Sequence, residues 1–225
     1  MRSKASHDTP KAIKPLNTIS AYVTLSSVVY YATAIFLLHV LRTDFDPEYR
    51  YLSEYAVGPY GALMTSTFFV LSLGSIALPF GLLSSVSSRY RFFPGLLFWL
   101  AWAGAVFLAG FYPSDLQGAP HTRVGQIHDR MGMIAFPSAA VAIPLLSLPL
   151  RWEKEWHLVW GRTMFLSLVV VVCFLALDSF GRVGLEGLDQ RIFLAATLMW
   201  MWILGRNLLM IAKRAARLPP DSHIN

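Results

Sequence analysis

The stretch "GALMTSTFFVLSLGSIALPFGLLS" (residues 61–84) contains no charged side chain. A helix needs about 20 apolar residues to cross the hydrocarbon core of a bilayer, and this stretch is long enough to do so. Backbone N–H and C=O groups find no water in that core, so a single segment can pair them only by forming a helix. Residues 61–84 therefore predict a membrane-spanning helix.

Further apolar runs of similar length lie on both sides of this one, at residues 19–41, 94–112, 132–150, 162–180 and 192–213. The chain has a mean hydropathy of +0.50, and 14% of its residues are charged, whereas a typical soluble domain has about 25%. We expect an all-α fold, a bundle of six transmembrane helices that forms one domain over residues 19–213. Basic tails flank this domain at residues 1–18 and 214–225.

The basic residues are divided unevenly between the two sides that six spans would create. Thirteen of the 19 Lys and Arg fall on the side of the termini: Arg2, Lys4, Lys11, Lys14, Arg89, Arg91, Arg151, Lys154, Arg162, Arg206, Lys213, Arg214 and Arg217. Since cytoplasmic loops are enriched in Lys and Arg, we expect a multi-pass protein of the inner (plasma) membrane with both termini cytoplasmic. The net charge of +6 fits this topology and an attraction to membrane lipid, so nucleic-acid binding is not expected.

One connection on the side of the termini, "RWEKEWHLVWGR" (151–162), combines basic residues with three tryptophans. Trp152, Trp156 and Trp160 recur every four residues, which would place them on one face of a helix. Because Trp is enriched at the membrane–water interface, we expect these residues to form an interfacial anchor.

The first connection on the opposite side, "RTDFDPEYRYLSEYAVGPYG" (42–61), is rich in hydrogen-bonding groups. Asp46 before a proline is a typical helix start, and Gly58 before another proline is a typical stop. We therefore expect a short amphipathic helix of about three turns that lies on the bundle. Arg50 and Glu54 are four residues apart and can form an ion pair.

The other two connections on this side are "FYPSDLQGAPHTRVGQIHDRMG" (111–132) and "LDSFGRVGLEGLDQR" (177–191), in which Asp189 is expected to cap the sixth span. His121 and His128 would lie two helical turns apart, about 10.5 Å along the axis, which is too far to bind one metal ion together. The chain has no HEXXH or CXXC pattern. We therefore predict no metal site, and the sequence indicates no particular cofactor.

These three connections place His, Ser, Arg and acidic side chains on one side of the membrane, above an apolar bundle. Such a combination is typical of a site for an amphiphilic ligand. The candidate catalytic residues are His128, Asp178, Glu54 and Asp115. The candidate substrate-binding residues are Arg50, Arg123, Ser53, His121 and Arg182.

Each candidate has a structural alternative. His128 could be a general base or metal ligand, or could bond a carboxylate such as that of Asp129 or Asp178. Asp178 could be catalytic, or could be the ion-pair partner of Arg182. The arginines could bind lipid phosphate or balance the surrounding acids, and Ser53 could be a nucleophile or a helix cap.

Four segments, in this order, resemble the domain-of-unknown-function 998 family: "LRTDFDPEYRYLSEYAVGPYGALMTSTFFVLSLG" (41–74), "FYPSD" (111–115), "HTRVGQIHDRMG" (121–132) and "LDQRIFLAATLMWMWILGRNL" (188–208). The family consists of six-span integral membrane proteins found mainly in bacteria and archaea. The resemblance extends over almost the whole chain from residue 19. It implies the six-helix fold but no reaction, since the family has no established general activity.

We expect first a lipid- or isoprenoid-processing enzyme whose polar site lies on the non-cytoplasmic face. The alternative is a non-catalytic subunit that binds membrane lipid or stabilises a partner. The expected partners are membrane lipid and either another membrane protein or further copies of the same chain in a homo-oligomer. Transport of a neutral or amphiphilic solute ranks third, because the middles of the spans carry almost no ionisable residues.

Overall fold

The computed structural model describes residues 13–217, apart from the side chains of residues 13–15 and of Asp178. The remaining parts of the two predicted basic tails, residues 1–12 and 218–225, lie outside the described residues. The elements are α1 (Ile13–Leu41), η1 (Leu52–Ala56), α2 (Gly61–Ser85), η2 (Arg89–Phe92), α3 (Phe93–Ala109), α4 (Arg123–Ser147), η3 (Leu148–Trp152), α5 (His157–Gly181) and α6 (Glu186–Arg217), where η marks a 3-10 helix.

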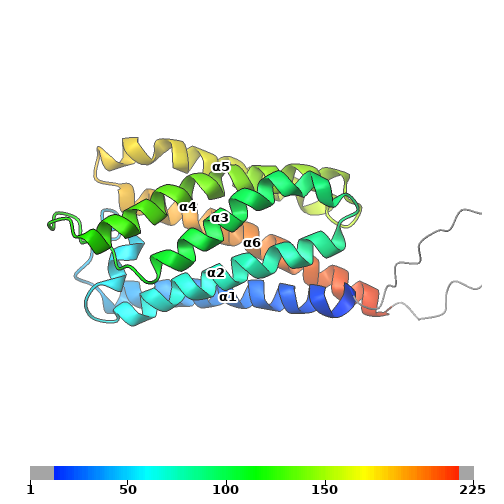
Figure 1. The fold of residues 1–225 in the computed structure, drawn as a ribbon, viewed down its shortest axis with the longest axis horizontal. Coiled ribbons are helices and arrows are strands. Elements are labelled where there is room, and N and C mark those ends of the chain that lie inside the picture. Colours follow the sequence, from blue (N-terminus) through cyan, green and yellow to red (C-terminus); the bar gives the residue numbers. More distant parts are fainter. Residues whose placement is uncertain (1–12, 218–225) are drawn as a thin grey trace, which may run out of the picture.

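The six α-helices form a closed ring of neighbours. Each helix packs against the next, and α6 packs against both α1 and α2, which closes the ring. The start of α1 and the end of α6 lie at the same end of the molecule (Figure 1), which we call the terminal end. The opposite end, the loop end, carries the connections at residues 42–60, 110–122 and 182–185.

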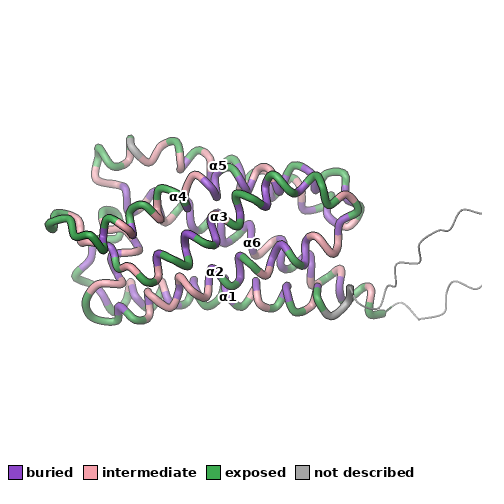
Figure 2. Tube along the Cα trace, in the orientation of Figure 1, coloured by how far each residue is buried: buried purple, intermediate pink, exposed green. Residues whose placement is uncertain are grey.

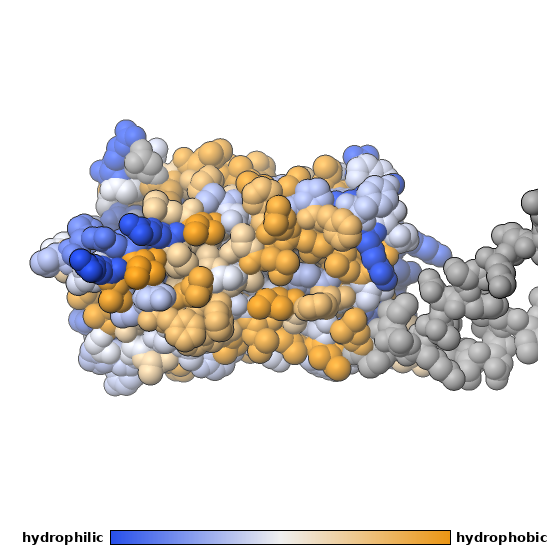
Figure 3. All heavy atoms as spheres, in the orientation of Figure 1, coloured by the Kyte–Doolittle hydropathy of each residue, from blue (hydrophilic) through white to orange (hydrophobic). Residues whose placement is uncertain are grey.

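All six α-helices are long and apolar enough to cross a membrane, with candidate spans of 21 to 32 residues. An apolar belt separates two hydrophilic ends on the face shown in Figure 3. The predicted all-α bundle of six transmembrane helices is therefore confirmed.

Four helices, α1, α4, α5 and α6, begin at least five residues before the apolar runs predict, and the local cause is clear for two of them. α4 begins at Arg123 because the Thr122 hydroxyl accepts a hydrogen bond from the Gly125 N–H (3.0 Å) and caps the helix. α6 begins at Glu186, just after Gly184 reverses the chain with a φ of 73°. The prediction that Asp189 caps the sixth span is wrong, because Asp189 lies inside the first turn of α6.

The short helix predicted in the first connection is present as η1, but it is shorter than three turns. Asp46 does start a turn, in which its Oδ1 accepts a hydrogen bond from the Glu48 N–H (2.9 Å). The chain is then extended at Tyr51, with ψ at 148°, and this interrupts the helix. The interruption lets the Glu54 side chain accept the Tyr51 N–H (2.9 Å).

Trp99, Trp102 and Trp200 are among the most deeply buried large side chains, and buried positions recur along the helices of the bundle (Figure 2). The Trp99 and Trp200 rings lie 4.9 Å apart. An indole N–H in an apolar core needs an acceptor. Trp99 donates to the Ser75 carbonyl oxygen (2.7 Å), and Trp200 donates to the Ser147 hydroxyl (2.8 Å). These hydrogen bonds fix how α2, α3, α4 and α6 meet.

The tryptophans of the terminal end do not share one face. Trp152 is 56% exposed, whereas Trp156 is fully buried. The expectation of a shared face is wrong because the chain forms η3 and a turn before α5 begins at His157, rather than one continuous helix. Of these two residues, only Trp152 can contact the membrane interface.

Candidate functional site

Residues 42–60, 110–122 and 182–191, which we call the polar cap, cover the loop end of the bundle. Glu54 connects its parts and is only 1% exposed. Its carboxylate accepts hydrogen bonds from Arg50 Nη1 (2.7 Å), the Tyr51 N–H (2.9 Å) and the Gln117 N–H (3.0 Å). Glu54 therefore joins the first connection to the second, and the predicted Arg50–Glu54 ion pair is present.

Arg191, near the start of α6, attaches the polar cap to the helices. Its Nη1 donates to the carbonyl oxygens of Arg50 (2.7 Å) and Gly187 (2.8 Å). Its Nε donates to Nε2 of His39 in α1 (3.0 Å). The His39 Nδ1 lies 2.7 Å from the Ile35 carbonyl oxygen and must donate to it, which leaves Nε2 free to accept.

Gly187 lets the first connection approach α6 closely. The Leu188 N–H donates to the Glu48 carbonyl oxygen (2.9 Å). A Cβ atom at Gly187 would lie 2.5 Å from the Arg50 carbonyl oxygen and 2.8 Å from those of Glu48 and Pro47. Since these obstacles are backbone atoms, a side chain at this position would push the cap away from α6.

We expect Gly187→Ala to lower the stability of the protein by about 2 kcal/mol, or its unfolding midpoint by roughly 6 °C. Thermal unfolding of the detergent-purified protein, followed by circular dichroism, measures this. Gly181→Ala is the control, because a Cβ there meets no atom within 4 Å. Equal midpoints for the two variants would contradict the proposed close approach.

Asp115 organises the start of α4. Its carboxylate accepts hydrogen bonds from the Thr122 N–H (2.7 Å) and the Thr122 hydroxyl (2.8 Å). The hydrogen bond from the Thr122 N–H, followed by that from its hydroxyl, lowers the pKa of Asp115 from its usual value. The carboxylate thus holds the residue that caps α4.

Asp115 should make part of the stability depend on pH. A carboxylate with a lowered native pKa stabilises the fold above its unfolded pKa of about 3.9, and this contribution disappears as the pH falls through the native pKa. We expect Asp115→Asn to be less stable than wild type at pH 7 and the difference to shrink below about pH 4. Unfolding midpoints measured across this range test the prediction, which a constant difference would refute.

Two further acids of the polar cap are buried at the start of α6. Glu186 and Asp189 are 6% and 2% exposed. Glu186 Oε1 accepts from Gln117 Nε2 (2.7 Å), whereas Glu186 Oε2 and Asp189 Oδ1 have no hydrogen-bond partner within the described residues. Burial and the surrounding carboxylates, Glu186 foremost, raise the pKa of Tyr51. Among the side chains that the structure describes, no three His, Cys, Asp or Glu form a group that could hold a metal ion.

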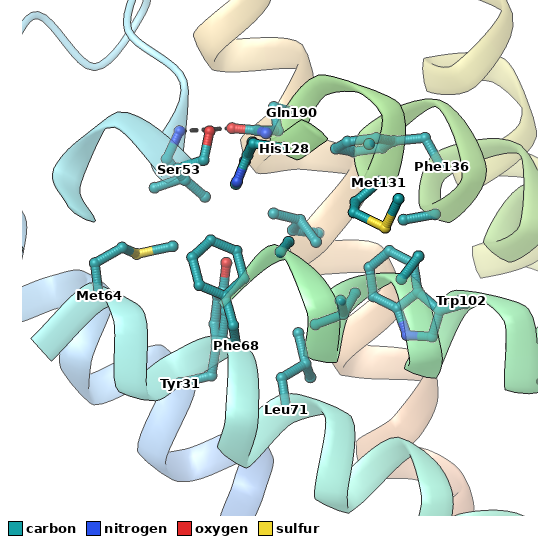
Figure 4. A pocket seen from close by; sticks show the side chains of 17 residues that line it. Tyr31, Ser53, Met64, Phe68, Leu71, Trp102, His128, Met131, Phe136 and Gln190 are labelled. Atoms are coloured by element: carbon teal, nitrogen blue, oxygen red, sulfur yellow. Dashed lines mark hydrogen bonds between the residues drawn. The ribbon is translucent and has the colours of Figure 1, made fainter. Parts of the chain in front are cut away.

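A cavity lies beneath the polar cap and is lined by residues of all α-helices except α5 (Figure 4). Its volume is about 60 Å³, enough for a few water molecules or a short apolar group. The largest side chains of its wall are Met64, Phe68, Trp102, Met131 and Phe136. No charged residue is among the described residues that line it, so the wall suits an uncharged ligand.

Four polar side chains reach this cavity: Tyr31, Ser53, His128 and Gln190. Ser53, His128 and Gln190 lie together at one end of it, and the Tyr31 hydroxyl points into it (Figure 4). Gln190 Oε1 accepts a hydrogen bond from the Leu52 N–H (2.6 Å), so the amide nitrogen of Gln190 points away from Leu52. Within residues 13–217, the hydroxyls of Tyr31 and Ser53 have no hydrogen-bond partner.

His128 is oriented by the second connection. Its Nδ1 lies 2.7 Å from the Tyr112 carbonyl oxygen. Because a carbonyl oxygen can only accept, Nδ1 carries the proton, and the neutral ring keeps Nε2 as an acceptor. The ring packs edge-on against Phe68, with centroids 5.8 Å apart. Nδ1 thus bonds a backbone carbonyl rather than the Asp129 carboxylate, and His128 can offer a lone pair to a ligand.

The structure separates the nine candidate residues. Two line the cavity: His128 and Ser53. Three are bonded within the polar cap: Arg50, Glu54 and Asp115. Two are exposed beside the start of α4: His121 and Arg123. The last two lie near the end of α5: Asp178, whose side chain is outside the described part of the chain, and Arg182. Their catalytic and binding roles stay predictions.

Sequence reasoning missed Tyr31, Gln190 and Arg191. No motif marks them, and their only signal is a polar group inside or beside an apolar run. Gln190 and Arg191 are adjacent in α6, yet Gln190 faces the cavity while Arg191 reaches the polar cap and α1. Only the packing of α6 against η1 and α1 distinguishes these roles.

Six membrane-spanning helices, five of which line an uncharged cavity beneath a polar cap, define the class: this is a multi-pass α-helical membrane protein. Residues 24–207 match the family model described as "Protein of unknown function (DUF998)". The chain belongs to this family. No curated protein and no solved structure gives a significant match.

Proposed function

We propose that this protein binds a neutral amphiphile in the cavity beneath the polar cap. The ligand has a hydroxyl or carbonyl head and a hydrocarbon part, as in an isoprenoid or fatty alcohol. Because the cavity has a volume of about 60 Å³, it would hold the head and the first few carbons, and the rest of the chain would extend from it between the helices. The single observation that carries the proposal is the His128 Nε2 acceptor at the end of an uncharged, mostly apolar cavity. A ligand hydroxyl can donate to Nε2, whereas a charged head would be desolvated there without a counter-charge.

The bonding of the carboxylates favours binding over catalysis as the primary role. The Glu54 carboxylate already accepts three hydrogen bonds, and the Asp115 carboxylate accepts two from Thr122. Neither Glu54 nor Asp115 is among the residues that line the cavity. An alcohol would meet His128, Ser53 and Gln190 without disturbing these bonds.

Binding is tested with farnesol and with farnesyl phosphate, which shares its chain but carries a charged head. We expect farnesol to raise the unfolding midpoint of the detergent-purified protein through His128, whereas any stabilisation by farnesyl phosphate should be the same in wild type and in His128→Ala. His128→Ala should weaken farnesol binding about tenfold, since it removes the acceptor. His121→Ala is the matched control on an exposed residue. No stabilisation by farnesol, or equal farnesol affinity in the His128 and His121 variants, would refute the proposal.

A second candidate function, favoured by the unpartnered Ser53 hydroxyl near His128, is a lipid- or isoprenoid-processing hydrolase. Ser53 Oγ would attack the carbonyl carbon of an ester while His128 Nε2 takes its proton. The proton then passes to the leaving alkoxide, and water releases the acyl group from Ser53. In this hydrolase, Asp178 would act as a carboxylate partner, and Arg50 and Arg123 would lie beside the head group of the lipid.

Hydrolysis is distinguished from binding by Ser53→Ala. If the protein is a hydrolase, Ser53→Ala and His128→Ala abolish cleavage of a neutral lipid ester while the protein stays folded, and Asp178→Asn slows it. Ester cleavage that survives Ser53→Ala would exclude the serine mechanism. Binding of farnesol without any ester cleavage would leave the primary proposal in place.

The orientation we propose is that both termini lie in the cytoplasm and the cavity is close to the outer face of the plasma membrane. The terminal end carries most of the basic residues, which supports this orientation. A fluorescent protein or alkaline phosphatase fused after residue 225 tests it. Active phosphatase at this position would reverse the assignment.

A further inference from the structure

A groove at the terminal end lies between the start of α3 and the end of α4. Its lining residues are Arg91, Pro94, Leu145, Leu148, Pro149 and Trp152. The groove has a volume of about 530 Å³. It lies at the opposite end of the bundle from the cavity beneath the polar cap, so it does not depend on the proposed function.

Two guanidinium groups lie against the indole of Trp152. The Cζ atom of Arg151 lies 4.9 Å from the ring centroid of Trp152, and that of Arg91 lies 5.4 Å from it. Both distances are within the range of a cation–π interaction. Trp152 therefore holds two positive charges at the mouth of an otherwise apolar groove.

Both guanidinium groups keep their hydrogen-bond donors available. The Arg91 guanidinium donates only to the Tyr90 hydroxyl, over 3.4 Å, and the Arg151 guanidinium makes no hydrogen bond to the described residues. Arginine donors form paired hydrogen bonds with phosphate oxygens. The two arginines can thus take an anionic phosphate group without breaking a strong contact.

The acids at this end are already engaged. Glu153 is 3% exposed and accepts the backbone N–H groups of Ser87 (2.7 Å) and Ser88 (3.2 Å). Glu155 pairs with Arg214 (3.5 Å). Within the described residues, neither carboxylate neutralises Arg91 or Arg151, so the mouth of the groove keeps its positive charge.

The apolar wall determines what kind of phosphate compound fits. Leu145 at the end of α4 and Leu148 at the start of η3 line the groove, and the exposed Trp152 is the last residue of the candidate span Arg123–Trp152. Trp at the end of a span is typical of the lipid head-group region. A soluble phosphate would leave this wall exposed, whereas a phospholipid covers it with its acyl chain. We propose that the groove binds one anionic phospholipid, with its phosphate at Arg91 and Arg151.

Native mass spectrometry of the detergent-purified protein tests this with phosphatidylglycerol and phosphatidylcholine of the same chain length. We expect wild type to retain phosphatidylglycerol about tenfold more strongly, and Arg91→Gln with Arg151→Gln to remove this preference. Trp152→Leu keeps the apolar wall but removes the ring that both arginines contact, leaving Arg151 against Trp160 and Arg91 against Tyr90, and should reduce the preference about threefold.

The control variant carries Lys213→Gln and Arg217→Gln, which removes the same charge from exposed positions of the same end. We expect it to keep the preference for phosphatidylglycerol. A loss equal to that of the arginine variant would show that diffuse charge, not the groove, attracts the lipid. Displacement of the lipid by soluble glycerol phosphate, or equal retention of both lipids by wild type, would also overturn the proposal. Circular dichroism confirms that each variant is folded.

Discussion

Glu54→Ala should destabilise the protein by about 3 kcal/mol, or roughly 10 °C in its unfolding midpoint. The carboxylate is almost fully buried and accepts hydrogen bonds from Arg50, Tyr51 and Gln117. Its removal leaves these donors without an acceptor inside the polar cap, and such groups cost more than the bonds themselves contribute. The effect should be among the largest of any polar substitution in the chain.

The control for Glu54 is Glu48→Ala, because Glu48 lies in the same connection and its side chain is exposed. This variant should unfold within about 0.5 kcal/mol of wild type. Glu54→Gln should fall between the two, since an amide oxygen can replace only one of the two carboxylate oxygens. If Glu54→Ala is no less stable than Glu48→Ala, Glu54 does not hold the cap together.

Gly74→Val should destabilise the protein by about 3 kcal/mol, because α1 and α2 approach each other closely at this glycine. A Cβ at Gly74 would overlap the Ser27 hydroxyl and lie 2.5 Å from the Ser27 Cβ. The helices would have to separate, which would also break the hydrogen bond from the Thr24 hydroxyl to the Gly74 carbonyl oxygen (3.3 Å). Small residues permit such contacts between membrane helices.

Gly104→Val, on the exposed side of α3, is the matched control, since a Cβ there meets no atom within 4 Å. Thermal unfolding followed by tryptophan fluorescence should separate the two valine variants clearly. Ser27→Gly combined with Gly74→Val removes the obstructing atoms and should recover part of the lost stability. The absence of any recovery would place the cause of the destabilisation elsewhere.

Much of the fold could be predicted from local sequence. The run at residues 61–84 becomes α2 almost residue for residue, and the Arg50–Glu54 pair follows from a spacing of four. Asp189 shows the limit of this reasoning. It has the residue type and place of a helix cap, but the turn at Gly184 starts α6 one turn earlier and buries its side chain.

The candidate site could be predicted only in part, for a related reason. His128 was identified from its residue type, but the tautomer that makes it an acceptor depends on Tyr112, 16 residues earlier. Gln190 forms part of the cavity because its side chain bonds Leu52, 138 residues away. Sequence spacing contains no information about such pairs, because they form only when the helices pack.

The sequence by itself determined the six spans, their all-α character and the side of the bundle on which the polar groups collect. It could do so because each backbone group in a membrane must be paired within its own helix, so a short apolar run contains all the information needed. Only the tertiary structure decided that Glu54 holds the cap and that His128 faces an uncharged cavity. A buried polar side chain takes whichever partner packing brings within about 3 Å, and that partner can lie anywhere in the chain.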